Sequence, residues 1–290
     1  MKKVLVTGAH GLLGQSIKSY QNQFLNYHFF FAEKDKLDIT SKEKIKDFVV
    51  EYSIDIIINC AAYTNVDGAE LASKKADELN FQAVKNLAEV AKSHEVSLVH
   101  ISTDYVFDGN SKVPYLETDD LNPQNVYGVT KLKGENILKK INPNNSIIIR
   151  TAWLYGEYGN NFVKTMLKLF SERDCISVVS DQIGTPTYAM DLANTILQIA
   201  SNINCKNVEV YHYTNSGFCS WYDFAKEILM LTKHKCAIKP VTSINYPTEA
   251  RRPKFSLLNT EKIQYEFNIE IPNWKDSLNK CVGALEKSEE

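Results

Sequence analysis

The chain has 290 residues, of which 44% are hydrophobic and 23% charged, and this composition is typical of a globular protein with a sizeable core. A formal net charge of -2 without a long basic block gives no electrostatic footprint for nucleic acid or an anionic membrane surface. Six scattered cysteines, no apolar run approaching the roughly 18 residues that span a bilayer, and no cleavable signal at MKKVLVTGA predict a cytoplasmic protein with free thiols, no membrane contact and no metal site.

Short apolar segments alternate with helical patterns over the first part of the chain. The segments KVLVTG, HFFFAE, DIIINCAA, SLVHIST and NSIIIRTA are typical of buried strands. Helices are predicted from about Leu13, Ser41 and Ala72, over about 127–140, and around 161–172. Because strands separated by helices form parallel sheets covered on both faces, we predict an α/β fold with a Rossmann-type doubly wound parallel sheet. This dinucleotide-binding domain would span residues 1–170, with some later segments interleaved.

The loop after the first strand reads GAHGLLG and places Gly8, Gly11 and Gly14 three residues apart. Glycines let the backbone turn tightly beside a pyrophosphate, and the helix that follows offers free N–H groups at its N-terminus. The loop therefore predicts a dinucleotide site, with GxxGxxG in place of the more common GxGxxG. Glu33 and Lys34 follow the second strand, where an acid favours the ribose of NADH and a base favours the phosphate of NADPH, so both cofactors stay open.

The stretch NVYGVTKLKGE places Tyr127 and Lys131 four residues apart, on one face of a predicted helix. A cation beside a phenol favours the phenolate, so we expect Lys131 to lower the pKa of Tyr127 and the pair to serve acid/base chemistry. The alternative is an ordinary solvated helix face. Thr103 and Asp104 end a buried strand, where parallel sheets bind ligands, although such a pair can also simply turn the chain.

Beyond about residue 171 the alternation becomes looser. We predict that residues 171–290 mainly form a smaller α/β C-terminal lobe that binds the substrate and packs on the sheet. One aromatic cluster is interpreted as the core of this lobe because such rings bury large areas; it comprises Tyr211, Tyr213, Trp221, Tyr222 and Phe224.

Four motifs together resemble the extended short-chain dehydrogenases/reductases: GxxGxxG, NCAAYTNVDGAE, STDYVFDG and YGVTK. Later stretches resemble the dTDP-4-dehydrorhamnose reductase family, namely RTAWLYG, NNFVKTML, SDQIGTPTYAMDLA, YHYTNSGFCSWYDFA and RRPKFSLLNT. The resemblance runs almost end to end. It implies hydride transfer from NADPH or NADH to the 4-keto group of dTDP-4-dehydro-L-rhamnose. The product would be dTDP-L-rhamnose, a donor for lipopolysaccharide/O-antigen and other cell-surface polysaccharide.

The resemblance also implies roles for individual residues. Tyr127 would protonate the carbonyl oxygen, Lys131 would assist it and bond the nicotinamide ribose, and Thr103 would orient the carbonyl. Asp104 and Trp153 would touch the sugar nucleotide, although a tryptophan after a buried strand is more often a core residue. The cofactor contacts would be Gly8, Gly11, Leu12, Leu13, Gly14, Asp38, Ile39, Ala62, Tyr63, Thr64, Tyr127 and Lys131.

Several alternatives stay open at this point. Sugar-nucleotide 4,6-dehydratases carry a glutamate directly after the Thr-Asp pair, and Tyr105 occupies that position here, which disfavours elimination. An epimerase or reductase of another deoxysugar and a non-catalytic regulatory subunit share the architecture. The sequence also leaves open a homodimer, a divalent ion, and whether Arg251 or Arg252 binds a diphosphate.

Overall fold

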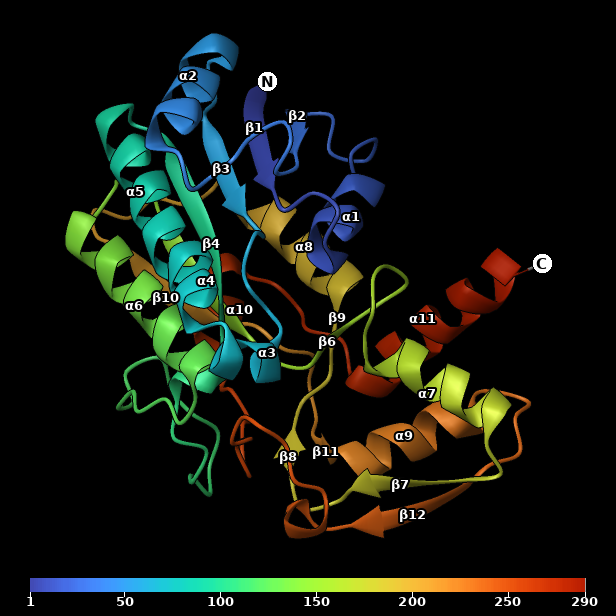
Figure 1. Ribbon diagram of the computed structural model, residues 1–290. Coiled ribbons are helices and arrows are strands. Elements are labelled where there is room, and N and C mark those ends of the chain that lie inside the picture. The colour runs from blue at the N-terminus through green and yellow to red at the C-terminus, as the bar shows by residue number, and fades with distance from the viewer. Residues whose placement is uncertain (290) are drawn as a thin grey trace.

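Parallel strands form the central sheet of this computed structural model, which describes the backbone of residues 1–289 and the side chains of residues 1–287. The strand order is β10-β5-β4-β3-β1-β2, and all neighbours in it pair in parallel (Figure 1). The bounds are β1 (Lys2–Thr7), β2 (Tyr27–Ala32), β3 (Ile56–Asn59), β4 (Ser97–Thr103), β5 (Ile147–Thr151) and β10 (Glu209–His212). The predicted doubly wound parallel sheet is confirmed.

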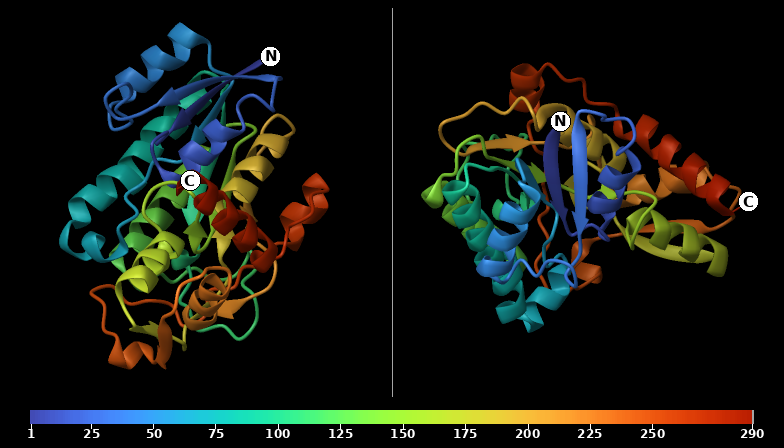
Figure 2. Two further views of the ribbon diagram at one scale, coloured as in Figure 1. Left: turned by 90° about the vertical axis from the view of Figure 1, so that its right-hand side faces the viewer. Right: turned by 90° about the horizontal axis from the view of Figure 1, so that it is seen from above.

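Helices cover both faces of this sheet (Figures 1 and 2). One apolar core joins the sheet to α1 (Leu12–Ser19), α8 (Ala189–Ile199) and α10 (Glu261–Phe267). A second core, on the other face, joins it to α2 (Lys42–Tyr52), α5 (Ala83–Ser93) and α6 (Val126–Ile141). Burial on both faces is why β3 reads IIIN and β5 reads IIIRT, with every residue buried, rather than alternating between apolar and polar.

The helix predicted from Ala72 changes its geometry part of the way along. It follows α3 (Val66–Leu71) as α4 (Ser73–Asp77), continues as a π-helical segment η1 (Glu78–Gln82), and only then becomes α5. Such a widened turn changes which side chains face inward. Here the buried Asn80 lies within it.

A smaller lobe packs around a core of its own, at the lower right of Figure 1. Its elements are α7 (Phe162–Glu172), β7 (Cys175–Val179), α9 (Trp221–Met230), β12 (Ala237–Val241) and α11 (Trp274–Glu289). Short paired strands lie between the lobes, namely β6 (Leu154–Tyr155) with β9 (Thr187–Tyr188) and β8 (Ile183–Gly184) with β11 (Cys219–Ser220). The predicted boundary near residue 170 falls within α7, and the chain returns to the sheet for α8, β10 and α10.

The aromatic residues of the second half do not form one cluster, so that interpretation is wrong. Tyr211 and Tyr213 pack in the core of the sheet, whereas Trp221 and Phe224 pack in the smaller lobe. The reason is that β10, which contains Tyr211, joins the sheet beside β5, and Tyr213 follows it directly with its N–H bonded to the Arg150 carbonyl. Within residues 1–289, no helix is both long and apolar enough to cross a lipid bilayer.

Candidate active site

A cleft of about 730 Å³ opens at the carboxyl ends of the central strands. Its lining includes Thr7 at the end of β1, Cys60 after β3, Thr103 at the end of β4 and Thr151 at the end of β5. The chain passes from β1 to β2 on one side and to β3 on the other, and open α/β sheets bind their ligands at such a switch point. The volume is in the range of cofactor and substrate sites.

The glycine loop forms one wall of this cleft. Gly8 has a φ of +65°, and a Cβ there would stand 2.7 Å from the backbone nitrogen of Ala61, so only glycine fits. Gly11 is the N-cap of α1, and no side chain of residues 1–287 caps that helix, so its first N–H groups are available to an anion. Gly14 lies outside the lining, and a Cβ there would meet the Gly8 carbonyl oxygen at 2.4 Å. Gly14 therefore serves close packing of the helix on the loop.

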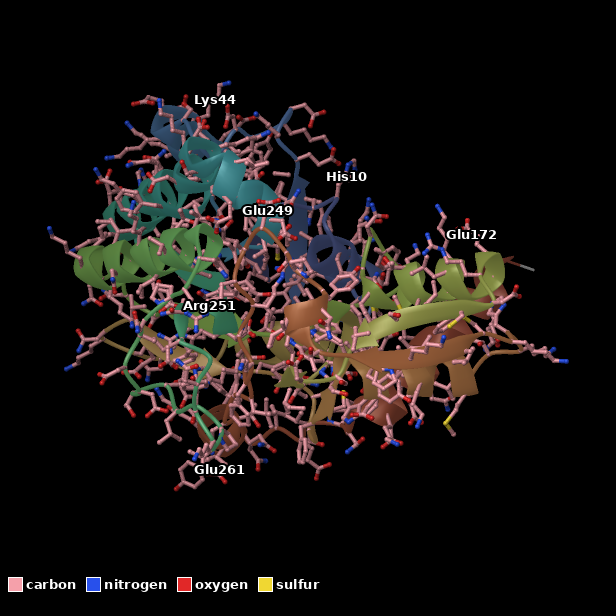
Figure 3. The ribbon with its side chains drawn as sticks, turned by 60° about the horizontal axis from the view of Figure 1, so that its bottom comes forward. His10, Lys44, Glu172, Glu249, Arg251 and Glu261 are labelled. Atoms are coloured by element: carbon pink, nitrogen blue, oxygen red, sulfur yellow. The ribbon has the colours of Figure 1, made fainter. Side chains whose placement is uncertain are left out.

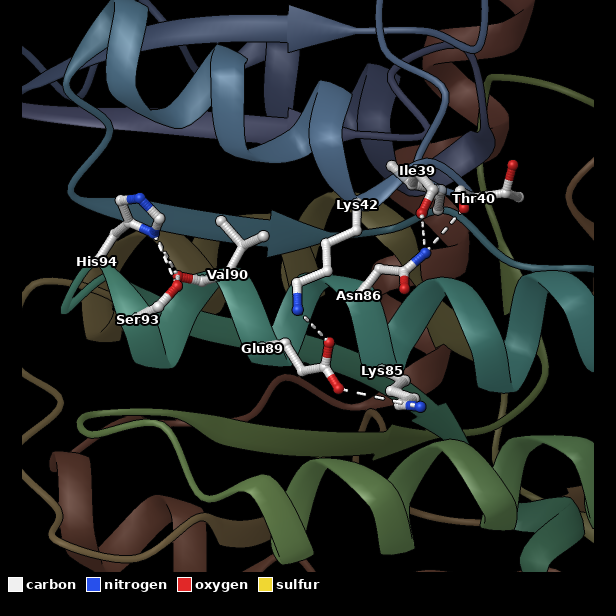
Figure 4. A network of polar contacts seen from close by, with 9 residues as sticks. All are labelled: Ile39, Thr40, Lys42, Lys85, Asn86, Glu89, Val90, Ser93 and His94. Carbon is white, nitrogen blue, oxygen red and sulfur yellow. Dashed lines mark hydrogen bonds and ion pairs between the residues drawn. The ribbon is translucent and has the colours of Figure 1, made fainter.

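A fixed turn at 38–40 borders the far end of the cleft, where Asp38 and Ile39 are lining residues. The Asp38 carboxylate accepts hydrogen bonds from the Thr40 hydroxyl (2.8 Å) and backbone N–H (3.0 Å), which lowers the pKa of Asp38. From α5, the Asn86 amide donates to the Thr40 carbonyl at 2.9 Å and to the Ile39 carbonyl at 3.4 Å (Figure 4). The turn is thus held before a ligand arrives.

Glu33 and Lys34 line the same end of the cleft. The Glu33 carboxylate pairs with His10, which extends from the turn between β1 and α1 at the molecular surface (Figure 3). An acid and two basic groups therefore surround the position next to β2 that distinguishes a ribose hydroxyl from a ribose phosphate. The acid suits the ribose of NADH and the bases suit the phosphate of NADPH, so this end of the cleft is compatible with both cofactors.

The middle of the cleft is lined by Ala62 and Thr64, while Tyr63 between them is not a lining residue. The backbone of Tyr63 is held by Asn80, whose Oδ1 accepts from the Tyr63 N–H (2.8 Å) and whose Nδ2 donates to the Tyr63 carbonyl (3.1 Å). Asn80 Nδ2 also donates to the Thr130 hydroxyl at 3.1 Å. Sequence reasoning missed Asn80, although an asparagine within the predicted long helix was a usable signal.

Tyr127 and Lys131 both line the cleft, one turn apart on α6. Asn125 caps this helix by accepting from the Gly128 N–H at 2.8 Å. A Cβ at Gly128 would stand 2.2 Å from the Tyr105 carbonyl oxygen, so α6 approaches the end of β4 closely. Lys131 is 2% exposed, and its Nζ donates to the carbonyl of Ile101 at 2.6 Å.

The expectation that Lys131 lowers the pKa of Tyr127 is wrong for this structure. Removal of water raises the pKa of the Tyr127 phenol, and the Thr103 side chain opposes that shift only in part. Lys131 is itself buried, which lowers its pKa to about 8, and its Nζ bonds the Ile101 carbonyl. A phenol that keeps its proton at neutral pH is a proton donor, which is the role needed for reduction of a carbonyl.

Thr103 and Asp104 lie side by side at the floor of the cleft. The Thr103 hydroxyl donates to Asp104 Oδ1 at 2.9 Å, while Asp104 Oδ2 is buried near the Ser256 hydroxyl and makes no hydrogen bond of ordinary geometry among residues 1–287. Burial raises the pKa of Asp104 to about 6. An unpaired buried carboxyl oxygen costs free energy unless a ligand bonds it, so its place in the lining is a mark of a binding site.

Trp153 is partly buried: it packs against the core of the smaller lobe and also lines the cleft. Its φ is +48°, which is uncommon for a bulky side chain and costs on the order of 1–3 kcal/mol. The indole stacks on Trp221 with ring centroids 3.5 Å apart and planes at 10°. A Cβ at Gly184 would stand 2.6 Å from the Trp153 ring, so this glycine leaves room for the stack.

Arg251 and Arg252 do not line the main cleft; both line a separate hollow of about 260 Å³. Arg252 pairs with Asp67 (Nη2 to Oδ2, 2.5 Å) and donates to the Tyr105 hydroxyl at 3.2 Å. Arg251 is exposed and donates to Gln124 at 3.1 Å (Figure 3). In this structure Arg252 therefore connects the loop near residue 250 to α3 and to the segment that follows β4.

Comparison with known proteins places the chain in one family. The family described as "RmlD substrate binding domain" matches residues 1–287. A dTDP-4-dehydrorhamnose reductase of Aggregatibacter actinomycetemcomitans is 42% identical, covering 99% of this chain and 100% of that protein. Crystal structures of dTDP-4-dehydrorhamnose reductases from Clostridium acetobutylicum and, in complex with NADP, from Bacillus anthracis are 43% and 38% identical. Their TM-scores are 0.92 and 0.93, over 98% of this chain and 99% and 100% of theirs.

Proposed function

Because the chain belongs to the dTDP-4-dehydrorhamnose reductase family, we propose that its cleft performs the family's reaction with Tyr127 as the proton donor. The chain is an NAD(P)H-dependent oxidoreductase that reduces the 4-keto group of dTDP-4-dehydro-L-rhamnose to give dTDP-L-rhamnose. The observation that supports the residue assignment is the presence of Tyr127, Lys131 and Thr103 in the same cleft as the glycine loop.

Each of these side chains has a distinct task. A bound dihydronicotinamide supplies the hydride to carbon 4 of the sugar. As negative charge develops on the carbonyl oxygen, the Tyr127 hydroxyl delivers its proton to that oxygen. The Thr103 hydroxyl turns from its present acceptor, Asp104, to donate to the same oxygen. The Lys131 ammonium then returns a proton to the Tyr127 phenolate.

We propose that the cofactor lies along the glycine loop. The open N-terminus of α1 at Gly11, Leu12 and Leu13 would hold the pyrophosphate, because no side chain occupies its N–H groups. The turn at 38–39 would border the adenine, and residues 62–64 would border the middle of the dinucleotide.

We further propose that the sugar nucleotide lies in the part of the cleft where Asp104 follows β4 and where Trp153 packs against the smaller lobe. Trp153 and Asp104 would contact the sugar, because both line the cleft and each has a feature that a ligand would explain: an unusual backbone angle and an unpaired carboxyl oxygen. The use of the product in cell-surface polysaccharide, a homodimer and a cytoplasmic location stay predictions. Sedimentation of the purified chain and fractionation of the source cells would test the last two.

Tyr127→Phe tests the assignment directly, because it removes the transferable proton and keeps the ring. We expect kcat with dTDP-4-dehydro-L-rhamnose to fall by roughly 10²–10⁴-fold, as is typical for loss of a general acid. The dissociation constant of the cofactor should stay within about twofold, since the pyrophosphate and adenine contacts lie elsewhere. The measurement is absorbance of the reduced nicotinamide, with NADH and NADPH in parallel.

Tyr213→Phe is a matched control, since Tyr213 is a buried tyrosine in the sheet core and not a lining residue of the cleft. It should keep the wild-type rate. Wild-type activity in Tyr127→Phe would refute the proposed acid. If the protein oxidises the cofactor only with a different 4-keto sugar nucleotide, the proposed substrate is refuted and the proposed acid is not.

A further inference from the structure

A buried polar chain runs across the strands beneath Lys131, and the reaction described above does not use it. Thr7 on β1, Asn59 on β3 and His100 on β4 are 1%, 1% and 0% exposed. The Thr7 hydroxyl lies 2.6 Å from Asn59 Oδ1, Asn59 Nδ2 lies 3.0 Å from His100 Nδ1, and His100 Nε2 lies 3.5 Å from Lys131 Nζ. The chain therefore ends at the amino group of the candidate active site.

Hydrogen-bond chemistry sets the direction of this chain. The backbone N–H of Ala61 can only donate, and it donates to Asn59 at 3.3 Å, so the atom it meets is the Asn59 carbonyl oxygen. The Asn59 amide nitrogen must then be the atom that faces His100 Nδ1. An amide nitrogen also only donates, and therefore Nδ1 of His100 is an acceptor without a proton.

The proton of the His100 ring consequently lies on Nε2, facing Lys131. Burial and the neighbouring Lys131 charge both keep the pKa of His100 well below its usual range, so the ring is neutral and has a single N–H. The charged Lys131 ammonium has only donors, so it cannot form a hydrogen bond with the Nε2–H of His100. A neutral amine offers a lone pair and accepts a hydrogen bond from it.

We propose that His100 is a positioning residue of the reductase, locked by Asn59 so that its Nε2–H supports the amine form of Lys131 at the moment when Lys131 has given up a proton. The inference rests on the proposed roles of Tyr127 and Lys131. In each turnover Tyr127 protonates the sugar oxygen, and the Lys131 ammonium transfers one proton to the phenolate. The resulting amine accepts from His100, and a proton from solvent restores the ammonium. His100 keeps its own proton throughout.

Other ionisable groups also act on Lys131 and must stay constant in the test. Glu135, on the same helix, raises the pKa of Lys131, and its carboxylate is neutralised by Arg150 at 2.7 Å. From the other elements, the groups that face Lys131 or its partner Tyr127 are Cys60 after β3 and Asp104 and Tyr105 after β4. Substitution of His100 changes none of them, so a shifted pH profile reports on the ring.

The first test compares the pH dependence of kcat in His100→Leu and His100→Gln. Wild-type activity should fall above about pH 8, where Lys131 loses its proton. His100→Leu removes the donor that favours the amine, so this basic limb should move upward by about one pH unit and kcat at pH 7 should fall roughly tenfold. The Gln amide can place an N–H near the former Nε2 position, and His100→Gln should recover most of both changes.

His212→Gln is the matched control for the loss of a buried histidine. His212 is also 0% exposed, it lies on β10, and its Nε2 contacts Arg150 at 3.3 Å outside the cleft. This variant should lose thermal stability and keep the wild-type basic limb, because Arg150 binds Glu135 through Nε and Nη2 and contacts His212 only through Nη1. A His100→Leu variant with an unmoved or lowered basic limb would overturn the proposal.

A second test needs neither substrate nor cofactor. The protein is labelled with ¹⁵N in the rings of its six histidines. The ring signals that disappear in His100→Gln should show a proton on Nε2 and none on Nδ1. A signal with the proton on Nδ1 would overturn the proposal even if every variant were active. Failure of the wild type to reduce dTDP-4-dehydro-L-rhamnose would count against the assigned function alone, because the tautomer is read independently.

Discussion

At the scale of single residues, Lys131 opposes the stability of the fold that holds it. Its pKa is lowered from 10.5 to about 8 because burial disfavours the ammonium. Between these two values the unfolded chain holds a proton that the folded chain has lost, so stability increases with pH across this window. Below about pH 8 the folded protein bears the full cost of the buried charge, at about 1.4 kcal/mol per unit of pKa.

Replacement of this cation by an apolar side chain should therefore stabilise the protein. We expect Lys131→Met to unfold with a free energy about 1–3 kcal/mol higher than the wild type at pH 7, after allowance for the unpaired Ile101 carbonyl. The difference should shrink toward pH 10, as the wild type loses its penalty, and the variant should be inactive. Urea denaturation at both pH values measures it.

Lys133→Met is the control, because Lys133 lies on the same helix with its side chain 51% exposed. Its effect on stability should be small and independent of pH between 7 and 10. A Lys131→Met variant less stable than the wild type at pH 7 would mean that the amino group stabilises the fold, contrary to this account.

At the scale of elements, the π-helical segment η1 decides how three parts of the chain meet. It carries Asn80, which holds the backbone of Tyr63 beside the cleft and contacts Thr130 on α6. A Cβ at Gly134 would stand 2.2 Å from the Asn80 carbonyl oxygen, so α6 packs directly against η1. The backbone of residues 62–64, in the middle of the cleft, is therefore held in position by η1 and not by contacts within its own loop.

Asn80→Ala should loosen the backbone of residues 62–64. Both backbone groups of Tyr63 would lose their partner, so we expect about 2–3 kcal/mol less stability and a cofactor KM roughly tenfold higher, with little change in kcat. Steady-state kinetics with the cofactor varied and chemical denaturation measure the two effects. Asn215→Ala is the control, since Asn215 also holds a backbone N–H, that of Tyr188 at 2.7 Å, away from the cleft. If Asn215→Ala raised the cofactor KM as well, the change in Asn80→Ala would be a result of general destabilisation and not of the lost contact with Tyr63.

At the scale of the whole molecule, the cleft depends on contacts between segments far apart in the chain. Asp67 on α3 accepts from the Ala250 N–H at 3.0 Å and pairs with Arg252, which in turn contacts Tyr105 beside Tyr127. The loop near residue 250 is thereby held against α3 and the segment after β4, next to the proposed proton donor. Partly exposed pairs of this kind contribute little to stability, so their main effect is on position.

Asp67→Ala should consequently affect substrate binding more than folding. We expect the KM for the sugar nucleotide to rise about fivefold to tenfold, the KM for the cofactor to change less than twofold, and stability to fall by about 1 kcal/mol. Steady-state kinetics with each ligand varied in turn measures this split. Asp77→Ala removes a comparable pair, Asp77 with Lys133 at 2.6 Å, away from the main cleft, and should leave both KM values unchanged. Equal effects of Asp67→Ala on the two KM values would contradict the positional role.

Local patterns in the sequence were sufficient for much of the fold and for part of the site. The apolar strands, the glycine loop before α1 and the four-residue spacing of Tyr127 and Lys131 depend on neighbours along the chain, and period and turn chemistry predict such features. The parallel sheet followed from the alternation of strands and helices. Family resemblance added the reaction, which no periodicity encodes.

Tertiary structure alone decided the properties that depend on burial and on distant partners. The pKa of Tyr127 is raised where the spacing of its helix predicted a lowered value, because desolvation depends on what covers a side chain. The proton of His100 is placed by Asn59, 41 residues away, and the partner of Arg252 is Asp67, 185 residues away. Tyr211 joined the core of the sheet because β10 pairs with β5. A sequence determines which chemical groups are present, and the packed chain determines how much water, charge and hydrogen bonding each of them meets.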